Sequence, residues 1–115
     1  MAQLRIKRAY EAPAASDGVR VLVDRLWPRG LARDAARIDH WLKDVAPSSD
    51  LRKWFGHDPE RWPEFRKRYR VELQANAGAV AELRALAKGA KTLTLVFAAK
   101  DEAHNNAVVL KDLLD

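Results

Sequence analysis

The stretch Val19-Arg-Val-Leu-Val-Asp24 decides the fold class, because Val21, Leu22 and Val23 place apolar side chains on both faces of a strand. Burial on both faces is typical of the centre of a mostly parallel sheet. A second stretch, Thr92-Leu-Thr-Leu-Val-Phe97, is β-branched and apolar and predicts another buried strand. These two strands favour an α/β fold.

Neighbouring segments predict a further strand and two helix starts. Leu4–Tyr10 alternates apolar and basic residues, which is the period of a half-buried strand. Pro47-Ser-Ser-Asp50 predicts a helix start, because a serine side chain can accept from a free amide of the first turn, and Gly56 predicts the end of that helix. Asp58-Pro59-Glu60 predicts the next start, with a capping aspartate followed by proline.

The helical pattern that follows Glu60 continues to Gly89. Asn76 and Gly78 interrupt it, which predicts two helices with a kink or break between them. A closing helix is predicted near the carboxyl end from an apolar face formed by Ala107, Leu110 and Leu114.

One segment has no clear period. Ile38–Ala46 is ambiguous, although a fourth strand could lie within Ile38–Leu42, and a short helical turn could begin near Asp34. The order of elements predicts a small three-layer α/β/α domain with a short, mostly parallel sheet of three or four strands. We expect residues 1–115 to form this single domain.

The composition excludes several classes of protein. Of the 115 residues, 48% are hydrophobic, which suits a folded core rather than a disordered tail. The longest apolar run, Leu93–Ala99, is far too short to cross a bilayer, and the first ten residues lack the apolar region of a signal peptide. The chain has no cysteine, so disulfides and thiolate catalysis are excluded. We therefore expect a cytoplasmic protein without a membrane partner.

The formal net charge of +5 favours an anionic partner, and two segments indicate where it would bind. Ligands of open α/β sheets bind beyond the carboxyl ends of the strands. Asp24-Arg-Leu-Trp-Pro-Arg-Gly30 follows the first buried strand, and Ala98–Asn106 follows the second.

In the first of these segments, Arg25 and Arg29 flank Trp27. A guanidinium group matches the oxygen atoms of a carboxylate or phosphate with two parallel hydrogen bonds, and an indole ring can stack on a ligand. A structural alternative stays open, in which Arg25 pairs with a buried acid such as Asp24 or Asp101 and Trp27 belongs to the core. For Arg29 the binding role is favoured.

The second segment combines positive charge with groups that can move a proton. Lys100 adds a point charge, and His104 is the candidate acid–base residue, with Asp101 orienting it or a ligand. Asn105 and Asn106 supply hydrogen-bond donors and acceptors near the free amides of a helix start. The alternative is that Asp101 caps the helix and the other side chains are solvated residues of its first turn.

Sequence motifs give no sign of a metal or cofactor. The three histidines, His40, His57 and His104, lack the spacing of a metal-binding motif. The chain also lacks a nucleophile elbow, a Walker A loop and a dinucleotide-binding glycine pattern. We therefore expect neither a metal ion nor a cofactor.

Several motifs resemble those of the YeaO-like family, domain of unknown function 488. The most specific is Val23-Asp-Arg-Leu-Trp-Pro-Arg-Gly30. The resemblance continues through Ala46-Pro-Ser48, Trp54-Phe55, His57-Asp-Pro-Glu60, Phe65, Tyr69, Glu72-Leu73, Ala98-Ala-Lys-Asp-Glu102 and His104-Asn-Asn-Ala107. It implies a compact bacterial-type α/β domain but no activity. A more distant branch is similar in placing a cysteine–histidine–arginine triplet where this chain has Ala103-His104-Asn105, so a covalent thiol mechanism is not expected here.

Three functions compete at this stage. The first is a site, binding or catalytic, for an anionic small molecule such as phosphate, a nucleotide or a phosphorylated metabolite. The second is a nucleic-acid-binding module that uses the basic run Arg66–Arg70. The third is an interaction protein with an exposed patch formed by Trp41, Trp54 or Trp62. Neither a reaction nor an oligomeric state follows from the residues.

Overall fold

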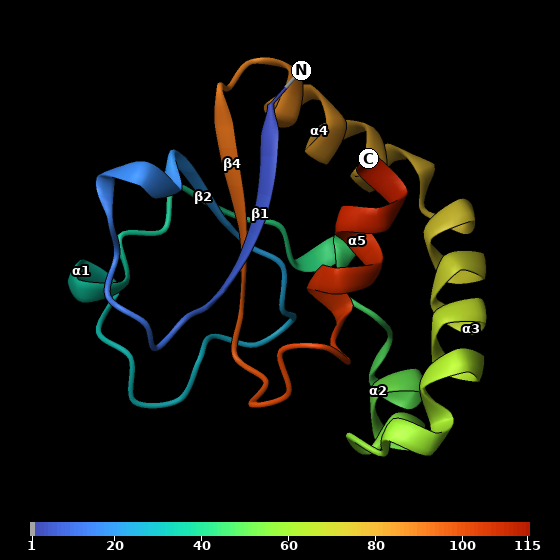
Figure 1. Ribbon diagram of the computed structural model, residues 1–115. Helices are drawn as coiled ribbons and strands as arrows, with labels where there is room; N and C mark the ends of the chain where they lie inside the picture. The colour runs from blue at the N-terminus through green and yellow to red at the C-terminus, as the bar shows by residue number, and fades with distance from the viewer. Residues whose placement is uncertain (1) are drawn as a thin grey trace.

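A sheet of four parallel strands lies at the centre of the computed structural model, which describes residues 2–115 (Figure 1). In chain order the strands are β1 (Gln3–Arg8), β2 (Val19–Leu22), β3 (His40–Trp41) and β4 (Thr92–Phe97). Their order across the sheet is β1-β4-β2-β3. The predicted parallel sheet is therefore confirmed, and the ambiguous segment contributes a fourth strand of two residues.

Helices cover the two faces of the sheet unequally (Figure 1). The helices are α1 (Arg33–Ala36), α2 (Ser49–Phe55), α3 (Trp62–Ala75), α4 (Ala77–Lys88) and α5 (Asn106–Leu114), with 3₁₀ turns η1 (Ala15–Asp17), η2 (Lys43–Val45) and η3 (Pro59–Arg61). Helices α2 to α5 lie on one side, whereas α1 and irregular loops lie on the other. The predicted three-layer α/β/α arrangement is confirmed, with a thin third layer.

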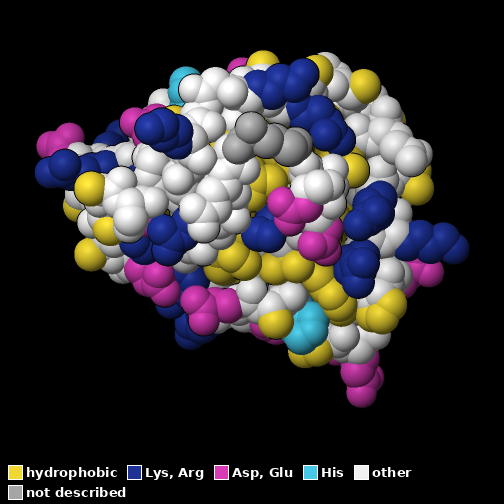
Figure 2. All heavy atoms as spheres, turned by 45° about the horizontal axis from the view of Figure 1, so that its top comes forward, with side chains coloured by type: hydrophobic (Ala, Val, Ile, Leu, Met, Phe, Trp, Pro, Cys, Tyr) yellow, Lys and Arg dark blue, Asp and Glu magenta, His cyan; other side chains and the backbone are white. Residues whose placement is uncertain are grey.

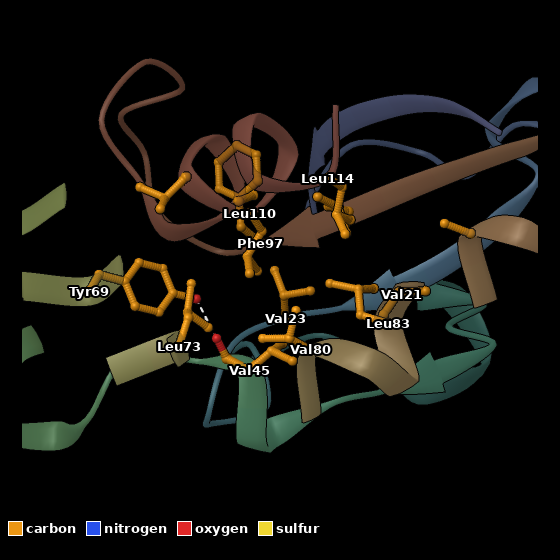
Figure 3. Close-up of a cluster of buried hydrophobic side chains, with 14 of the residues drawn as sticks. Val21, Val23, Val45, Tyr69, Leu73, Val80, Leu83, Phe97, Leu110 and Leu114 are labelled. Carbon is orange, nitrogen blue, oxygen red and sulfur yellow. Dashed lines mark hydrogen bonds between the residues drawn. The ribbon is translucent and has the colours of Figure 1, made fainter. Parts of the chain in front are cut away.

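The main core lies between the sheet and the long helices. Alternate residues of β4, Leu93, Leu95 and Phe97, point into it, because successive side chains of a strand face opposite ways. Figure 3 shows the ring of Tyr69 entering this core from α3, with its hydroxyl donating a hydrogen bond to the carbonyl oxygen of Val45. That bond satisfies the polar end of a fully buried side chain.

The opposite face of the sheet has a small core and a buried ion pair. Leu22 and Val96 pack there against partly buried residues that include Trp27 and Trp41. Near the start of β2, Asp17 and Arg20 are both almost fully buried. The structure therefore keeps charged groups under η1 rather than extending the apolar layer.

Most helix ends lie where the sequence indicates. Ser48 caps α2 by accepting from the amide of Leu51 at 3.1 Å, and Gly56 ends that helix with a φ of 55°. Asp58 caps η3, which leads directly into α3. The predicted break is confirmed at Asn76, where α3 ends and α4 follows.

The tryptophans do not form an exposed apolar patch. Trp41, Trp54 and Trp62 are each partly buried, and all three pack at the edge of a hydrophobic cluster. None of these three side chains is exposed, which does not favour the exposed tryptophan patch considered from the sequence. Within residues 2–115, no helix combines the length and the apolar character needed to traverse a lipid bilayer.

Candidate functional site

A cavity of about 330 Å³ opens at the carboxyl ends of the parallel strands. Residues that follow β1, β2 and β4 line it, together with the start of α5 and parts of α2 and α3. The loops after the strands meet at the lower edge of the sheet in Figure 1. The two segments singled out from the sequence thus lie around one hollow, as parallel strand ends require.

Arg29 stands on a tight turn at the mouth of this cavity. The amide of Leu31 donates to the carbonyl oxygen of Pro28 at 3.3 Å, and Gly30 between them adopts a φ of 76°, which favours glycine. The hydroxyl of Tyr10 donates to the carbonyl oxygen of Arg29 at 2.9 Å. These contacts fix the Arg29 backbone, and within residues 2–115 no ion pair engages its exposed guanidinium group.

Arg25 lines the cavity and also supports its wall. Its guanidinium group donates to the carbonyl oxygens of Pro47 at 3.4 Å and Ala46 at 3.3 Å. It therefore pairs with neither Asp24 nor Asp101, contrary to the structural alternative considered from the sequence. Within the described residues 2–115, no acidic side chain forms an ion pair with Arg25.

Trp27 has a partly structural role. Its indole nitrogen donates to the carbonyl oxygen of Leu31 at 2.7 Å, its ring meets the Trp41 ring edge to face, and the Arg33 guanidinium lies 4.5 Å from its centroid. The ring nevertheless contributes to the cavity wall. Its packing against the smaller core agrees with the structural alternative, and stacking on a ligand stays a prediction.

His104 and Asp101 form a hydrogen-bonded pair beside the cavity. The His104 Nδ1 atom lies 2.9 Å from the Asp101 Oδ2 atom, and the Trp62 ring lies against the imidazole edge to face. The hydrogen bond from the His104 side chain lowers the pKa of Asp101, with help from the amide of Ala103. A carboxylate that holds a proton on Nδ1 leaves Nε2 as the acceptor nitrogen.

The helix after β4 begins later than the sequence suggests. Asn105 is the capping residue of α5, and its Oδ1 atom accepts from the amide of Val108 at 3.2 Å. Asp101 instead caps the preceding turn, where its Oδ1 atom accepts from the amides of Ala103 and His104. Asn105 is buried rather than solvated, so the alternative that it is a solvated first-turn residue is wrong.

Asp24 is a cavity residue that the sequence interpretation treated only as an ion-pair partner. Its Oδ2 atom accepts from the amide of Ala98 at 2.8 Å, and its Oδ1 atom accepts from the side-chain amide of Asn106 at 3.1 Å. Asn106 donates in addition to the carbonyl oxygen of Val23 at 2.9 Å. Burial raises the pKa of Asp24, an effect that these donors and the positive charge of Arg52 partly offset.

Helix α2 and the turn after it supply two further cavity residues that sequence reasoning missed. Arg52 and His57 are both exposed and line the cavity from this side, above the buried ring of Phe55. His57 adopts a φ of 58°, which is uncommon for a residue other than glycine. The resemblance motif around His57 was the only signal in the sequence that could have indicated it.

The structure brings only some of the candidate residues to the cavity. Five of those chosen from the sequence line the cavity: Arg25, Trp27, Arg29, His104 and Asn105. Asp101 reaches it only through His104, and the exposed Lys100 is not part of its wall. Within residues 2–115, no group of three or more His, Asp or Glu side chains is placed to hold a metal ion.

A family model described as the inactive DUF488-N3 subclade matches residues 3–115. The chain belongs to this family, DUF488-N3i. The match covers nearly the whole chain, so the resemblance found from the sequence motifs is confirmed.

Similar sequences are found in species of Mycobacterium and in Escherichia coli. The uncharacterized protein Rv3073c of Mycobacterium tuberculosis is 48% identical over 113 residues, covering 98% of this chain and 94% of the relative. The uncharacterized protein Mb3100c of Mycobacterium bovis has the same identity and coverage. The uncharacterized protein YeaO of Escherichia coli is 40% identical over 111 residues, 96% of either chain. No solved structure shows a significant match.

Proposed function

We propose that this chain binds an anionic small molecule, such as phosphate, a nucleotide or a phosphorylated metabolite, in the cavity at the strand ends. The observation that carries the proposal is the charge of the cavity wall. Three guanidinium groups, those of Arg25, Arg29 and Arg52, line it together with a single carboxylate. Guanidinium groups without an acidic partner attract anions, and the low-dielectric walls of a cleft strengthen that attraction.

The rest of the wall supports a ligand with an apolar part. Aromatic rings of Trp27, Phe55 and Phe65 lie in the lining, with Leu26 exposed beside them. A volume of about 330 Å³ is near the lower end of small-molecule pockets, which span roughly 300–1,000 Å³. A ligand with one ring system and one anionic group matches this size better than a dinucleotide does.

Binding is favoured over covalent chemistry. The family is described as inactive. Ala103 stands where a more distant branch that this chain resembles has a cysteine. The pair formed by His104 and Asp101 has the geometry of an acid–base group and its orienting carboxylate. We assign this pair to holding a ligand hydroxyl group, which donates a hydrogen bond to the acceptor Nε2 atom of His104 and can transfer its proton there.

Calorimetric titration with inorganic phosphate, ribose 5-phosphate and adenosine monophosphate tests the proposal. Replacing Arg29 or Arg52 with alanine should weaken binding of a phosphate-bearing probe by about tenfold or more, since charged hydrogen bonds contribute roughly 1.5–3 kcal/mol. Arg70→Ala is the matched control, because Arg70 is exposed on α3 and is not part of the cavity wall. Equal affinities in all three variants and the wild type would refute the site.

Nucleic-acid binding through α3 is the second candidate. All four basic residues of the basic run, Arg66, Lys67, Arg68 and Arg70, are exposed on the helix. The Arg68 guanidinium group also lies 3.4 Å from the Glu64 carboxylate and over the Trp54 ring. Figure 2 shows the basic side chains of one face of the molecule interspersed with acidic and hydrophobic ones rather than gathered into one patch. Among residues 2–115, Arg68 thus has an acidic partner, whereas no ion pair engages Arg66, Lys67 or Arg70.

Titration against DNA and RNA at two salt concentrations separates the two candidates. Nucleic-acid binding should weaken steeply as salt rises, and it should be lost in a variant with Arg66→Ala and Arg70→Ala. Binding that persists in this variant but disappears with Arg29→Ala would assign the anion affinity to the cavity. Binding lost only with the α3 substitutions would assign it to the helix.

A further inference from the structure

The Asp24 carboxylate is unusual in a cavity that is otherwise basic. It lies next to Arg25 in the chain and lines the same cavity as Arg29 and Arg52. Among the described residues 2–115, however, it forms no ion pair with any basic side chain. The negative charge of Asp24 repels a ligand that is anionic throughout. The cavity wall therefore has a basic part formed by the arginines and an acidic part formed by Asp24.

The two hydrogen bonds that Asp24 accepts do not exhaust its capacity. One donor is the Ala98 amide and the other is the Asn106 side chain, so each carboxylate oxygen has one partner. An ionised carboxylate offers about four acceptor positions, which leaves roughly half of them free. Asp24 is part of the cavity wall, so a donor on a ligand in this cavity is a candidate partner for these positions.

The structural role of Asp24 does not require its carboxylate to lie in the cavity wall. Its bonds tie the end of β2 to the first residue after β4 and to the first residue of α5. A carboxylate fully covered by the protein could make the same two connections, whereas an asparagine, with a single acceptor oxygen, could make only one of them. A role in ligand binding would explain why the Asp24 carboxylate keeps free acceptor positions beside the aromatic wall.

We infer that Asp24 favours the binding of anions whose planar ring carries an N–H donor. This inference rests on the proposed function. The guanidinium groups of Arg29 and Arg52, both on exposed side chains, receive the anionic group. The ring lies against the aromatic wall formed by Trp27 and Phe55 and presents its N–H group to the Asp24 carboxylate. Nucleoside monophosphates whose base carries an amino group are probes of this class.

Two pairs of probes that differ by a single amino group test the inference. The first pair is adenosine monophosphate and purine riboside monophosphate, and the second is cytidine monophosphate and 2-pyrimidinone riboside monophosphate. In at least one pair the wild-type protein should bind the amino compound about tenfold more tightly, as a hydrogen bond to a charged acceptor predicts. Asp24→Asn should reduce this ratio below about threefold, whereas Asp112→Asn on the exposed side of α5 should preserve it.

The outcomes separate this inference from the proposed function. Equal affinities within both pairs, together with binding that Arg29→Ala weakens, would refute the role of Asp24 and leave the anion site in place. Absence of binding for all four probes, ribose 5-phosphate and inorganic phosphate would refute both. If Asp24→Asn does not fold, as judged by circular dichroism, the wild-type ratios alone decide.

Discussion

The guanidinium group of Arg20 lies 2.7 Å from the carboxylate of Asp17, and both side chains are almost completely buried beneath the thin layer of the fold. Asp17 also accepts from the amide of Ala14 at 2.9 Å and from the Lys7 ammonium at 3.1 Å. Arg20 donates in addition to the carbonyl oxygen of Ala36, but its Nη2 atom has no hydrogen-bond partner. Arg20 thus depends on Asp17 for compensation of its charge.

Asp17→Asn should destabilise the protein by roughly 3–5 kcal/mol, because it leaves the buried Arg20 charge without its partner. Urea unfolding followed by circular dichroism measures this loss. Asp112→Asn, on an exposed residue, should change the free energy of unfolding by no more than about 0.5 kcal/mol. A loss below about 1 kcal/mol for Asp17→Asn would show that another group compensates the Arg20 charge.

Asp17 and Asp24 should affect stability in opposite directions as the pH changes. Burial acts to raise the pKa of Asp17, but the bonds from Ala14, Lys7 and Arg20 outweigh it, so the folded-state pKa lies below the ordinary value of 3.8. Asp17 therefore stabilises the folded state above that pH, and this contribution disappears as the pH falls through the folded pKa. Burial raises the pKa of Asp24, so its contribution is present at low pH and disappears as the pH rises through the folded pKa.

Urea unfolding at several values between about pH 3 and pH 7 checks both signs. The stability difference between the wild type and Asp17→Asn should grow as the pH rises. The stability of Asp24→Asn relative to the wild type should increase as the pH rises. The same sign for both variants would contradict the assigned environments.

Gly18→Ala should destabilise the protein more than Gly30→Ala. Both glycines have a positive φ, 63° and 76°, so an alanine is strained at either position. A Cβ atom at Gly18 would lie 2.2 Å from the carbonyl oxygen of Thr92, whereas one at Gly30 would meet no atom within 4 Å. The steric contact should add roughly 1–3 kcal/mol, measured by urea unfolding. Equal losses would show that β4 can shift away from the added methyl group.

His57→Gly should weaken ligand binding without destabilising the fold. Its φ of 58° suits glycine, so relief of backbone strain should offset the added entropy of the unfolded chain to within about 1 kcal/mol. The affinity for adenosine monophosphate should nevertheless fall, because His57 lines the cavity. Arg37→Gly is the control, since Arg37 has a φ of 49° and is not part of the cavity wall. Unchanged affinity in His57→Gly would exclude this imidazole from the site.

Local patterns were sufficient to predict most of the secondary structure. The doubly apolar pattern of Val19–Asp24 and the caps at Ser48 and Asp58 correspond to a central strand and two helical starts. The two-residue strand β3 was ambiguous because only His40 and Trp41 pair with β2, and so short a ladder has no period. The position of β4 between β1 and β2 depends on contacts distant in sequence, which local patterns do not contain.

The site was harder to predict than the fold. Arg25, Arg29 and His104 line the cavity because they follow or precede elements whose ends meet there. Arg52 reaches the same cavity from α2, and nothing in its local pattern distinguishes it from other exposed arginines. Asp101 and Asn105 are equally good capping residue types, so only the structure shows which one begins α5.

The outer strand β1 pairs with β4 and with no other described strand, so its remaining backbone groups face away from the sheet. Arg5 and Arg8 give this strand positive charge, whereas the Lys7 ammonium group is paired with Asp17 at 3.1 Å. Two copies that approached through these strands would repel each other, which opposes growth of the sheet into an intermolecular assembly. High ionic strength weakens that repulsion, so concentrated salt is the condition under which such self-association would first develop.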